Sequence, residues 1–181
     1  MRGRRLTVPP GEGVRPTKDI VREAMFSALD ARGAIVDAVV LDLYSGSGAL
    51  AIESLSRGAA RVVLVERERA ALDAISHNIG HLGIAHARVA RADVVSVLAG
   101  PPSKEAPFDL VLADPPYDTS DEAVADLLRS LTVPGWLSEE AMIAVERPTR
   151  ADVHPPKGLR ACWERTFGDT LMLFFDVDLP T

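Results

Sequence analysis

The apolar residues of this chain alternate between short continuous runs and longer stretches with helical spacing. Val39–Leu43, Arg61–Glu66 and Phe108–Ala113 are runs of strand length, dominated by Val and Leu. In 69–82 and 121–131 the apolar positions instead recur at the spacing of one helix face. Apolar strands that alternate with helices predict an α/β fold, in which helices cover both faces of a mostly parallel sheet.

Weaker patterns extend this alternation toward the two ends of the chain. A helix is expected from Thr17, which can cap its N-terminus, and further strands are expected at 87–91 and 141–146. The segment from Leu159 turns at Gly168-Asp169 and predicts an antiparallel hairpin at the end of the chain.

Length and composition favour an ordinary globular protein. The 181 residues suit one main domain. No apolar run reaches the ~20 residues that span a membrane, and no signal peptide is visible, so we expect a cytoplasmic protein that binds no membrane. Cys162 is the only cysteine, which excludes an internal disulfide. No third ligand accompanies His77 and His81, so we expect no metal site.

Charge is distributed unevenly along the chain. The formal net charge is −6, yet residues 1–22 hold six basic residues against Glu12 and Asp19. These residues, which we call the basic arm, carry about +4 and leave about −10 for the remainder. Such an arm is typical of a segment that binds a polyanion, although a few arginines would also serve only to solvate an N-terminus. The basic residues of the arm are Arg2, Arg4, Arg5, Arg15, Lys18 and Arg22.

Acidic residues stand at or just beyond the ends of the predicted parallel strands. They are Asp42, Glu66, Asp93 and Asp114. In parallel α/β sheets, ligands bind at this carboxyl edge of the strands. Acids gathered there suit a cation or sugar hydroxyls, and they would repel a phosphate group.

A glycine-rich turn, Gly46-Ser47-Gly48, follows the first of these strands. With Ala51 it matches the loose dinucleotide fingerprint, and Glu66 stands near the distance at which an acid holds a ribose. A nicotinamide enzyme is therefore an alternative, but Asp42 would repel a pyrophosphate and no hydride-transfer site is visible. The pattern favours S-adenosylmethionine, because Asp42 can face its ammonium group while the glycines let the backbone approach the rest.

The strand at 108–113 ends in Asp114-Pro115-Pro116-Tyr117. The two prolines make this segment rigid. An exocyclic amine of a nucleobase is a poor nucleophile, because its lone pair is delocalised into the ring. The Asp114 carboxylate and the Pro115 carbonyl can accept hydrogen bonds from such an amine and so free the lone pair, while Tyr117 can stack on an unstacked base. The tetrapeptide therefore predicts methyl transfer to a base amine, and the alternative is a rigid surface turn.

Four stretches of the sequence together resemble the RsmD-type methyltransferases, which modify the N2 amine of a guanine in small-subunit ribosomal RNA. They cover nearly the whole chain and read RGRRLTVP with RPTKDIVREAMFSAL, VLDLYSGSGALAIESLSRGA, VVLVERE and LVLADPPYD. The glycine turn and the tetrapeptide mark amino-methyltransferases in general, whereas the N-terminal stretch is more specific. Such proteins usually have a further short strand before this stretch, so we expect an incomplete N-terminal hairpin here.

The resemblance implies a Rossmann-like class I methyltransferase sheet in residues 31–181, preceded by a basic arm and helix in residues 1–30 that contact RNA. It implies S-adenosylmethionine as cofactor and a guanine of 16S rRNA, within an assembling small ribosomal subunit, as substrate. We expect a monomer. The expected cofactor-binding residues are Asp42, Tyr44, Ser45, Gly46, Ser47, Gly48, Glu66, Arg67, Asp93 and Val94. The expected catalytic residues are Asp114, Pro115, Pro116 and Tyr117.

Other functions share parts of this pattern. A DNA adenine-N6 methyltransferase uses the same tetrapeptide but usually adds a target-recognition region, for which no room is left after residue 147. A protein-glutamine methyltransferase usually has Asn at the position of Asp114. A non-catalytic RNA-binding subunit would keep the basic arm, but it would need neither the two acceptors nor the glycines.

Overall fold

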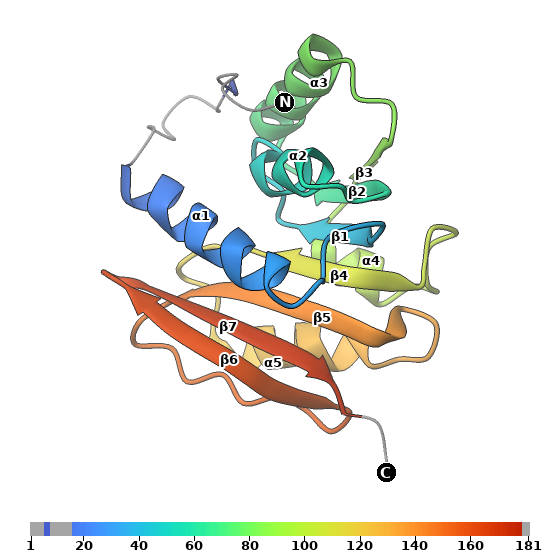
Figure 1. Ribbon diagram of the computed structural model, residues 1–181. Coiled ribbons are helices and arrows are strands. Elements are labelled where there is room, and N and C mark those ends of the chain that lie inside the picture. Colours follow the sequence, from blue (N-terminus) through green and yellow to red (C-terminus); the bar gives the residue numbers. More distant parts are fainter. Residues whose placement is uncertain (1–5, 8–15, 179–181) are drawn as a thin grey trace.

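A seven-stranded sheet runs through the centre of the computed structural model, which describes residues 6–7 and 16–178 (Figure 1). Its strands are β1 (Val39–Leu43), β2 (Arg61–Glu66), β3 (Ala87–Arg91), β4 (Phe108–Ala113), β5 (Leu137–Pro148), β6 (Leu159–Phe167) and β7 (Thr170–Val177). The strand order is β3-β2-β1-β4-β5-β7-β6. Neighbours from β3 to β5 pair in parallel, whereas β7 is antiparallel to both β5 and β6. The expected mostly parallel sheet with a C-terminal antiparallel hairpin is confirmed.

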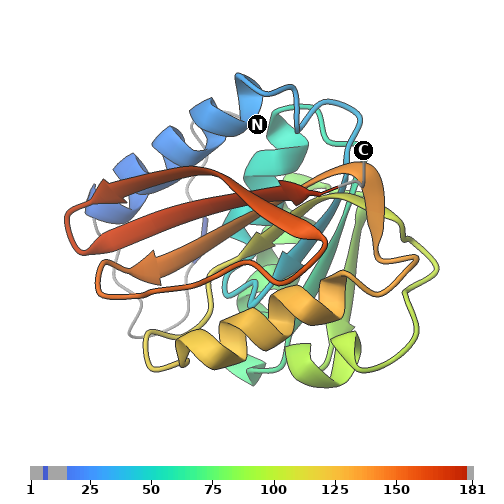
Figure 2. The same ribbon diagram turned by 90° about the horizontal axis from the view of Figure 1, so that it is seen from below.

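Helices cover both faces of this sheet, as Figure 2 shows for α1 and α5. The helices of the described residues are α1 (Pro16–Asp30), α2 (Ala49–Ser56), α3 (Arg69–Leu82), α4 (Val94–Leu98) and α5 (Asp121–Leu131). α1, α2 and α3 pack on one face, and α4 and α5 pack on the other. α1 begins at Pro16, so the prediction of Thr17 as its N-cap is wrong: proline is favoured in the first helical turn, where its missing N–H costs nothing.

Alternate residues of the buried strands build one apolar core on each face. In β1, Leu41 and Leu43 point toward α4 and α5, whereas Val40 points toward α1, α2 and α3. Asp42 follows the alternation onto the same side as Val40 and is fully buried there. α1 shares this core through Phe26, so the helix packs tightly on the sheet. The division of the chain after residue 30 stays a prediction about function.

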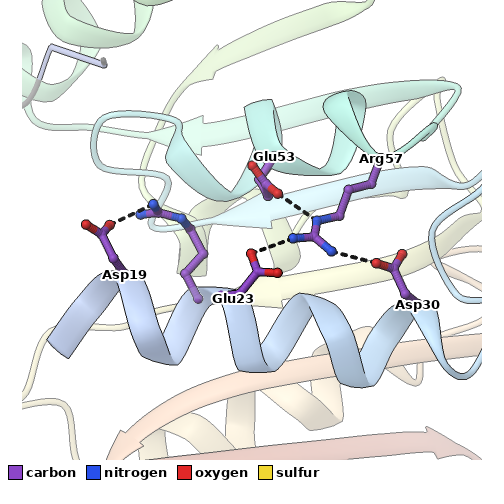
Figure 3. Close-up of polar contacts among 6 residues, drawn as sticks. Asp19, Glu23, Asp30, Glu53 and Arg57 are labelled. Atoms are coloured by element: carbon purple, nitrogen blue, oxygen red, sulfur yellow. Dashed lines mark hydrogen bonds and ion pairs between the residues drawn. The ribbon is translucent and has the colours of Figure 1, made fainter. Parts of the chain in front are cut away.

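Arg57, the residue that caps the C-terminus of α2, binds α1 to α2 (Figure 3). Its guanidinium donates to Glu23 Oε2 at 2.8 Å and to Asp30 Oδ2 at 2.6 Å, both on α1. It also donates to Glu53 Oε1 of α2 at 2.6 Å and lies 5.1 Å from the ring centroid of Phe26. α1 is therefore fixed against the helix that follows the glycine turn.

Two further observations concern membranes and metals. Within the described residues, no helix combines the length and apolar character that crossing a bilayer requires. The same residues contain no cluster of three His, Cys, Asp or Glu side chains that could hold a metal ion. His77 and His81 lie exposed on α3 with their rings stacked, 6.0 Å between centroids.

Candidate functional site

The residues that follow β1 and β4 lie next to each other at the carboxyl edge of the sheet. Leu43 is opposite Ala113 in the parallel pairing, so Tyr44 and Asp114 leave the sheet at the same level. β5 pairs with the other side of β4 and brings Glu146 to the other side of Asp114. The glycine turn and the Asp-Pro-Pro-Tyr segment, 66 residues apart at their nearest ends in the chain (Gly48 and Asp114), therefore share one edge.

The glycine turn needs glycine for two different reasons. Gly46 and Gly48 have φ values of +54° and +79°, in the left-handed region that side chains disfavour. A Cβ on Gly48 would also lie 3.1 Å from Leu64 Cδ2, whereas one on Gly46 would meet nothing within 4 Å. Gly48 thus lets the start of α2 pack on β2, while the backbone at Gly46 faces open space. Tyr44 adopts φ +59° without being glycine, a strained conformation of the kind that concentrates at functional sites.

Glu66, at the end of β2, holds the glycine turn in place. Its Oε2 accepts from the Gly46 N–H at 2.8 Å, and its Oε1 accepts from the N–H groups of Arg67 and Glu68 at 2.7 and 2.9 Å. The side chain is buried. Because each carboxylate oxygen has two acceptor sites, Glu66 can organise the turn and still accept from a ligand hydroxyl.

Asp42 is a fully buried carboxyl beneath the same turn. Its Oδ2 accepts from the Ala51 N–H in the first turn of α2 at 3.1 Å, and its Oδ1 has no hydrogen-bond partner among the described residues. Burial raises the pKa of Asp42 to about 8; the Ala51 hydrogen bond opposes this rise, and the charges of Asp114 and Glu66 add to it. The unsatisfied buried oxygen can accept a hydrogen bond from a ligand, and a positive charge bound beside it would lower the raised pKa of Asp42.

Asp93 and Arg67 lie beyond the ends of β3 and β2, at the same carboxyl edge of the sheet. Asp93 Oδ1 caps α4 by accepting from the Ser96 N–H at 3.2 Å, and its Oδ2 accepts from Arg67 Nη1 at 2.9 Å. The Ser96 hydrogen bond, together with that of Arg67, lowers the pKa of Asp93. The expected cofactor residue Val94 points into the core instead of lying on the surface, whereas its neighbour Val95 is exposed.

The Asp114–Tyr117 segment presents its residues at different depths. Pro115 is buried, Asp114 is half-buried, and Tyr117 is 48% exposed, which leaves much of its ring open for contact. The Pro116 carbonyl accepts from the Thr119 N–H at 2.9 Å and closes the turn. The segment is thus held as a compact turn with an exposed aromatic side chain.

Arg147, near the end of β5, supports this turn and was missed by reasoning from the sequence. It is 3% exposed, and its Nη2 donates to the Thr119 carbonyl and, at 3.4 Å, to Asp121 Oδ1. Its Nε and Nη1 have no partner within the described part of the chain. An arginine directly after the predicted apolar strand 141–146 was the available signal, but nothing in the sequence shows which loop it contacts.

The basic residues of the arm are only partly within the described residues. Arg2, Arg4, Arg5 and Arg15 lie outside them, as does the side chain of Lys18. Arg22 lies on α1 and donates to Asp19 Oδ1 at 2.7 Å. Their contacts with RNA stay a prediction.

Comparisons with known proteins identify the family of this chain. The family model described as Conserved hypothetical protein 95 matches residues 1–176. Ribosomal RNA small subunit methyltransferase D of Escherichia coli strain K12 is 41% identical over 145 residues, which are 80% of this chain and 70% of that protein. The protein of the same name from Haemophilus influenzae is 31% identical over 171 residues, which are 92% of this chain and 85% of that protein.

A solved structure extends the agreement to the fold. It is described as a candidate methyltransferase, yhhF from Escherichia coli, and it superimposes with a TM-score of 0.83 at 35% identity over 99% of this chain and 94% of that one. The chain therefore belongs to the family described as Conserved hypothetical protein 95 and is a methyltransferase of the RsmD type that its motifs resemble.

Proposed function

We propose that this protein transfers a methyl group from S-adenosylmethionine to the N2 amine of a guanine in 16S rRNA. The observation that carries the proposal is the adjacency of the glycine turn and the Asp114–Tyr117 segment at one edge of the sheet. The names of the relatives, which are ribosomal RNA small subunit methyltransferases, support the substrate.

The residues around the glycine turn fit S-adenosylmethionine, which supplies an activated methyl group on a cationic sulfonium. Asp42 has a buried oxygen without a partner, which can accept a hydrogen bond from the ammonium group of the amino-acid part, and the positive charge of that group would favour release of the Asp42 proton. Glu66 has remaining acceptor capacity for ribose hydroxyls. Gly46 offers open backbone. We assign Tyr44, Ser45, Ser47, Gly48, Arg67 and Asp93 to the walls of the same site, and Val94, whose side chain lies in the core, can contribute only its backbone.

Asp114 and Pro115 are the residues that we expect to activate the guanine amine. The Pro116 carbonyl is already bonded to Thr119 within the turn, so we assign the Pro115 carbonyl as the second acceptor beside the Asp114 carboxylate. Two hydrogen bonds from the amine draw its nitrogen toward tetrahedral geometry and direct its lone pair at the methyl group. The turn is fixed before the substrate binds, so these acceptors need no reorganisation during the reaction.

Tyr117 is the residue that we expect to stack on the target base. Its half-exposed ring lies three residues after Asp114, and a stacked base contributes roughly 1–3 kcal/mol. The guanine must leave its helix or already lie in a loop to reach this ring. The basic arm then contacts neighbouring phosphates. We propose further that the protein acts as a cytoplasmic monomer on assembling small subunits.

The proposal is tested by single-turnover methylation at saturating S-adenosylmethionine. Asp114→Ala should bind the cofactor almost normally and lose roughly 100- to 1000-fold in rate, because a preorganised acceptor is removed from the transition state. Asp114→Asn keeps an oxygen acceptor and should retain part of the activity. Asp118→Ala, a change to an exposed carboxylate next to Tyr117, is the matched control and should remain active. A fully active Asp114→Ala variant would show that the segment is only a turn.

A further inference from the structure

Asn78 of α3 lies where the basic arm meets the glycine turn. It is 2% exposed, and its side-chain amide makes three hydrogen bonds. The Thr7 N–H donates to Asn78 Oδ1 at 2.8 Å, and Asn78 Nδ2 donates to the Thr7 carbonyl at 2.9 Å. The same Nδ2 donates to the Ser47 carbonyl at 3.0 Å. One side chain thus binds two segments that lie 71 and 31 residues away in the chain.

The bonding of the Asn78 amide is specific. Both Nδ2 hydrogens are used, one on Thr7 and one on Ser47. Rotating the amide by half a turn would exchange Oδ1 and Nδ2 and place an oxygen against these two carbonyls, so only one orientation makes the contacts. The two bonds with Thr7 reproduce the reciprocal pairing of neighbouring strands. Asn78 therefore holds the backbone of residue 7 and is indifferent to its side chain.

On the other side, Asn78 completes the bonding of the glycine turn. Gly46 is held by Glu66 and the Gly48 N–H donates to the Ser45 carbonyl at 2.7 Å. The Ser47 carbonyl belongs to the same peptide group as the Gly48 N–H, so Asn78 and Ser45 fix the two ends of one peptide plane. Any change in the Asn78 amide is passed directly to the turn.

The basic arm is therefore attached to the proposed cofactor site at two places. Thr7 is bonded to Asn78 beside the turn, and α1 is fastened by Arg57 to α2, the helix that starts at the turn (Figure 3). Residues 8–15, which carry the predicted RNA contact Arg15, join these two attachments and lie outside the described residues.

We propose that Asn78 is a positioning residue that couples binding of RNA to binding of S-adenosylmethionine. Phosphate contacts that hold the basic arm favour the bonded state of Thr7, and the bonded Thr7 keeps the Asn78 amide aligned on Ser47. A turn aligned in this way binds the cofactor more tightly, and by thermodynamic reciprocity the cofactor strengthens RNA binding to the same degree. The inference rests on the proposed function of the turn and the arm.

The test is calorimetric binding of S-adenosylhomocysteine, the demethylated product, with and without small ribosomal subunits that lack the modification. For the unmodified protein we expect the subunits to tighten binding about tenfold, within the usual range of coupling between sites. Thr7→Pro removes the N–H that Asn78 accepts and should reduce this ratio toward one. Thr7→Ala keeps the backbone N–H and carbonyl and should preserve the ratio. Asn78→Asp loses both donated bonds and should abolish it.

Each outcome decides the inference. Ser76→Ala, a nearby change on the exposed side of α3, should keep the full ratio. Equal ratios for Thr7→Pro and Thr7→Ala would overturn the coupling, even if Asn78→Asp fails to fold. A ratio of one in the unmodified protein would also overturn it and leave the proposed function standing. Among these binding results, failure of the unmodified protein to bind S-adenosylhomocysteine at all is the one that would contradict the proposed function itself.

Discussion

Replacing Asp42 by Asn should remove a pH dependence of stability that the structure assigns to this residue. Asp42 is fully buried beneath the glycine turn, and burial raises its pKa from the ordinary 3.8 to about 8. The folded protein therefore binds this proton more tightly than the unfolded chain does. Protonation of Asp42 therefore stabilises the folded protein, and loss of this proton at higher pH lowers the free energy of unfolding.

The magnitude follows from the two pKa values. Between pH 3.8 and about 8 the folded protein still holds the proton, while the unfolded chain has released it. In this window the free energy of unfolding falls by about 1.4 kcal/mol for each unit of rising pH. Between pH 5 and 7.5 the loss from Asp42 amounts to about 3 kcal/mol, a large share of the ~5–15 kcal/mol by which folded domains are stable.

Urea unfolding of the unmodified protein and of Asp42→Asn measures this contribution. Asn resembles the protonated carboxyl, because its oxygen can still accept from the Ala51 N–H and it carries no charge. We expect the free energy of unfolding of the unmodified protein, measured relative to that of the variant, to fall by about 3 kcal/mol between pH 5 and 7.5. If the free energies of unfolding of both proteins follow the same pH profile, Asp42 does not titrate as the structure implies.

Further predictions concern the turn, its support and the arm. Gly46→Ala should lower the free energy of unfolding by about 1–2 kcal/mol, the cost of a left-handed conformation for alanine. Gly48→Ala should lower it by more, because only the Cβ at Gly48 meets a neighbouring side chain. Thermal or urea unfolding of the two variants checks this. Arg147→Met should slow single-turnover methylation about tenfold or more, because it releases the Thr119 carbonyl. The same variant should change the free energy of unfolding by less than about 2 kcal/mol, since a well-packed apolar residue often replaces a buried ion at little cost. An unchanged methylation rate would contradict this role of Arg147. Neutralising five basic residues should flatten the decrease of RNA affinity with salt, measured by filter binding, and an unchanged slope would count against phosphate contacts. These residues are Arg2, Arg4, Arg5, Arg15 and Lys18.

Hydrophobic periodicity predicted most elements of the sheet with their observed bounds, because β1, β2 and β4 are largely apolar on both faces and stop at polar residues. β5 is longer than the predicted 141–146, since the exposed Glu139 and Glu140 interrupt the apolar run although their backbone continues the strand. α4 was not predicted, because a helix of five residues is too short to show helical spacing.

Some residues of the candidate site could be predicted from the sequence, and others could not. Residues at or directly after strand ends, such as Glu66 and Asp114, could be selected from the sequence because the carboxyl edge of a parallel sheet gathers them. Asn78 and Arg147 could not, because their partners Thr7 and Thr119 meet them only through the tertiary fold.

The most direct measurement identifies the methylated nucleoside. Undermethylated small subunits, naked 16S rRNA and DNA are each incubated with the protein and labelled S-adenosylmethionine, followed by nuclease digestion and separation of the nucleosides. We expect label in N2-methylguanosine from 16S rRNA, and loss of this label with Asp114→Ala. Label in the adenine of DNA, or none in any nucleic acid, would contradict it.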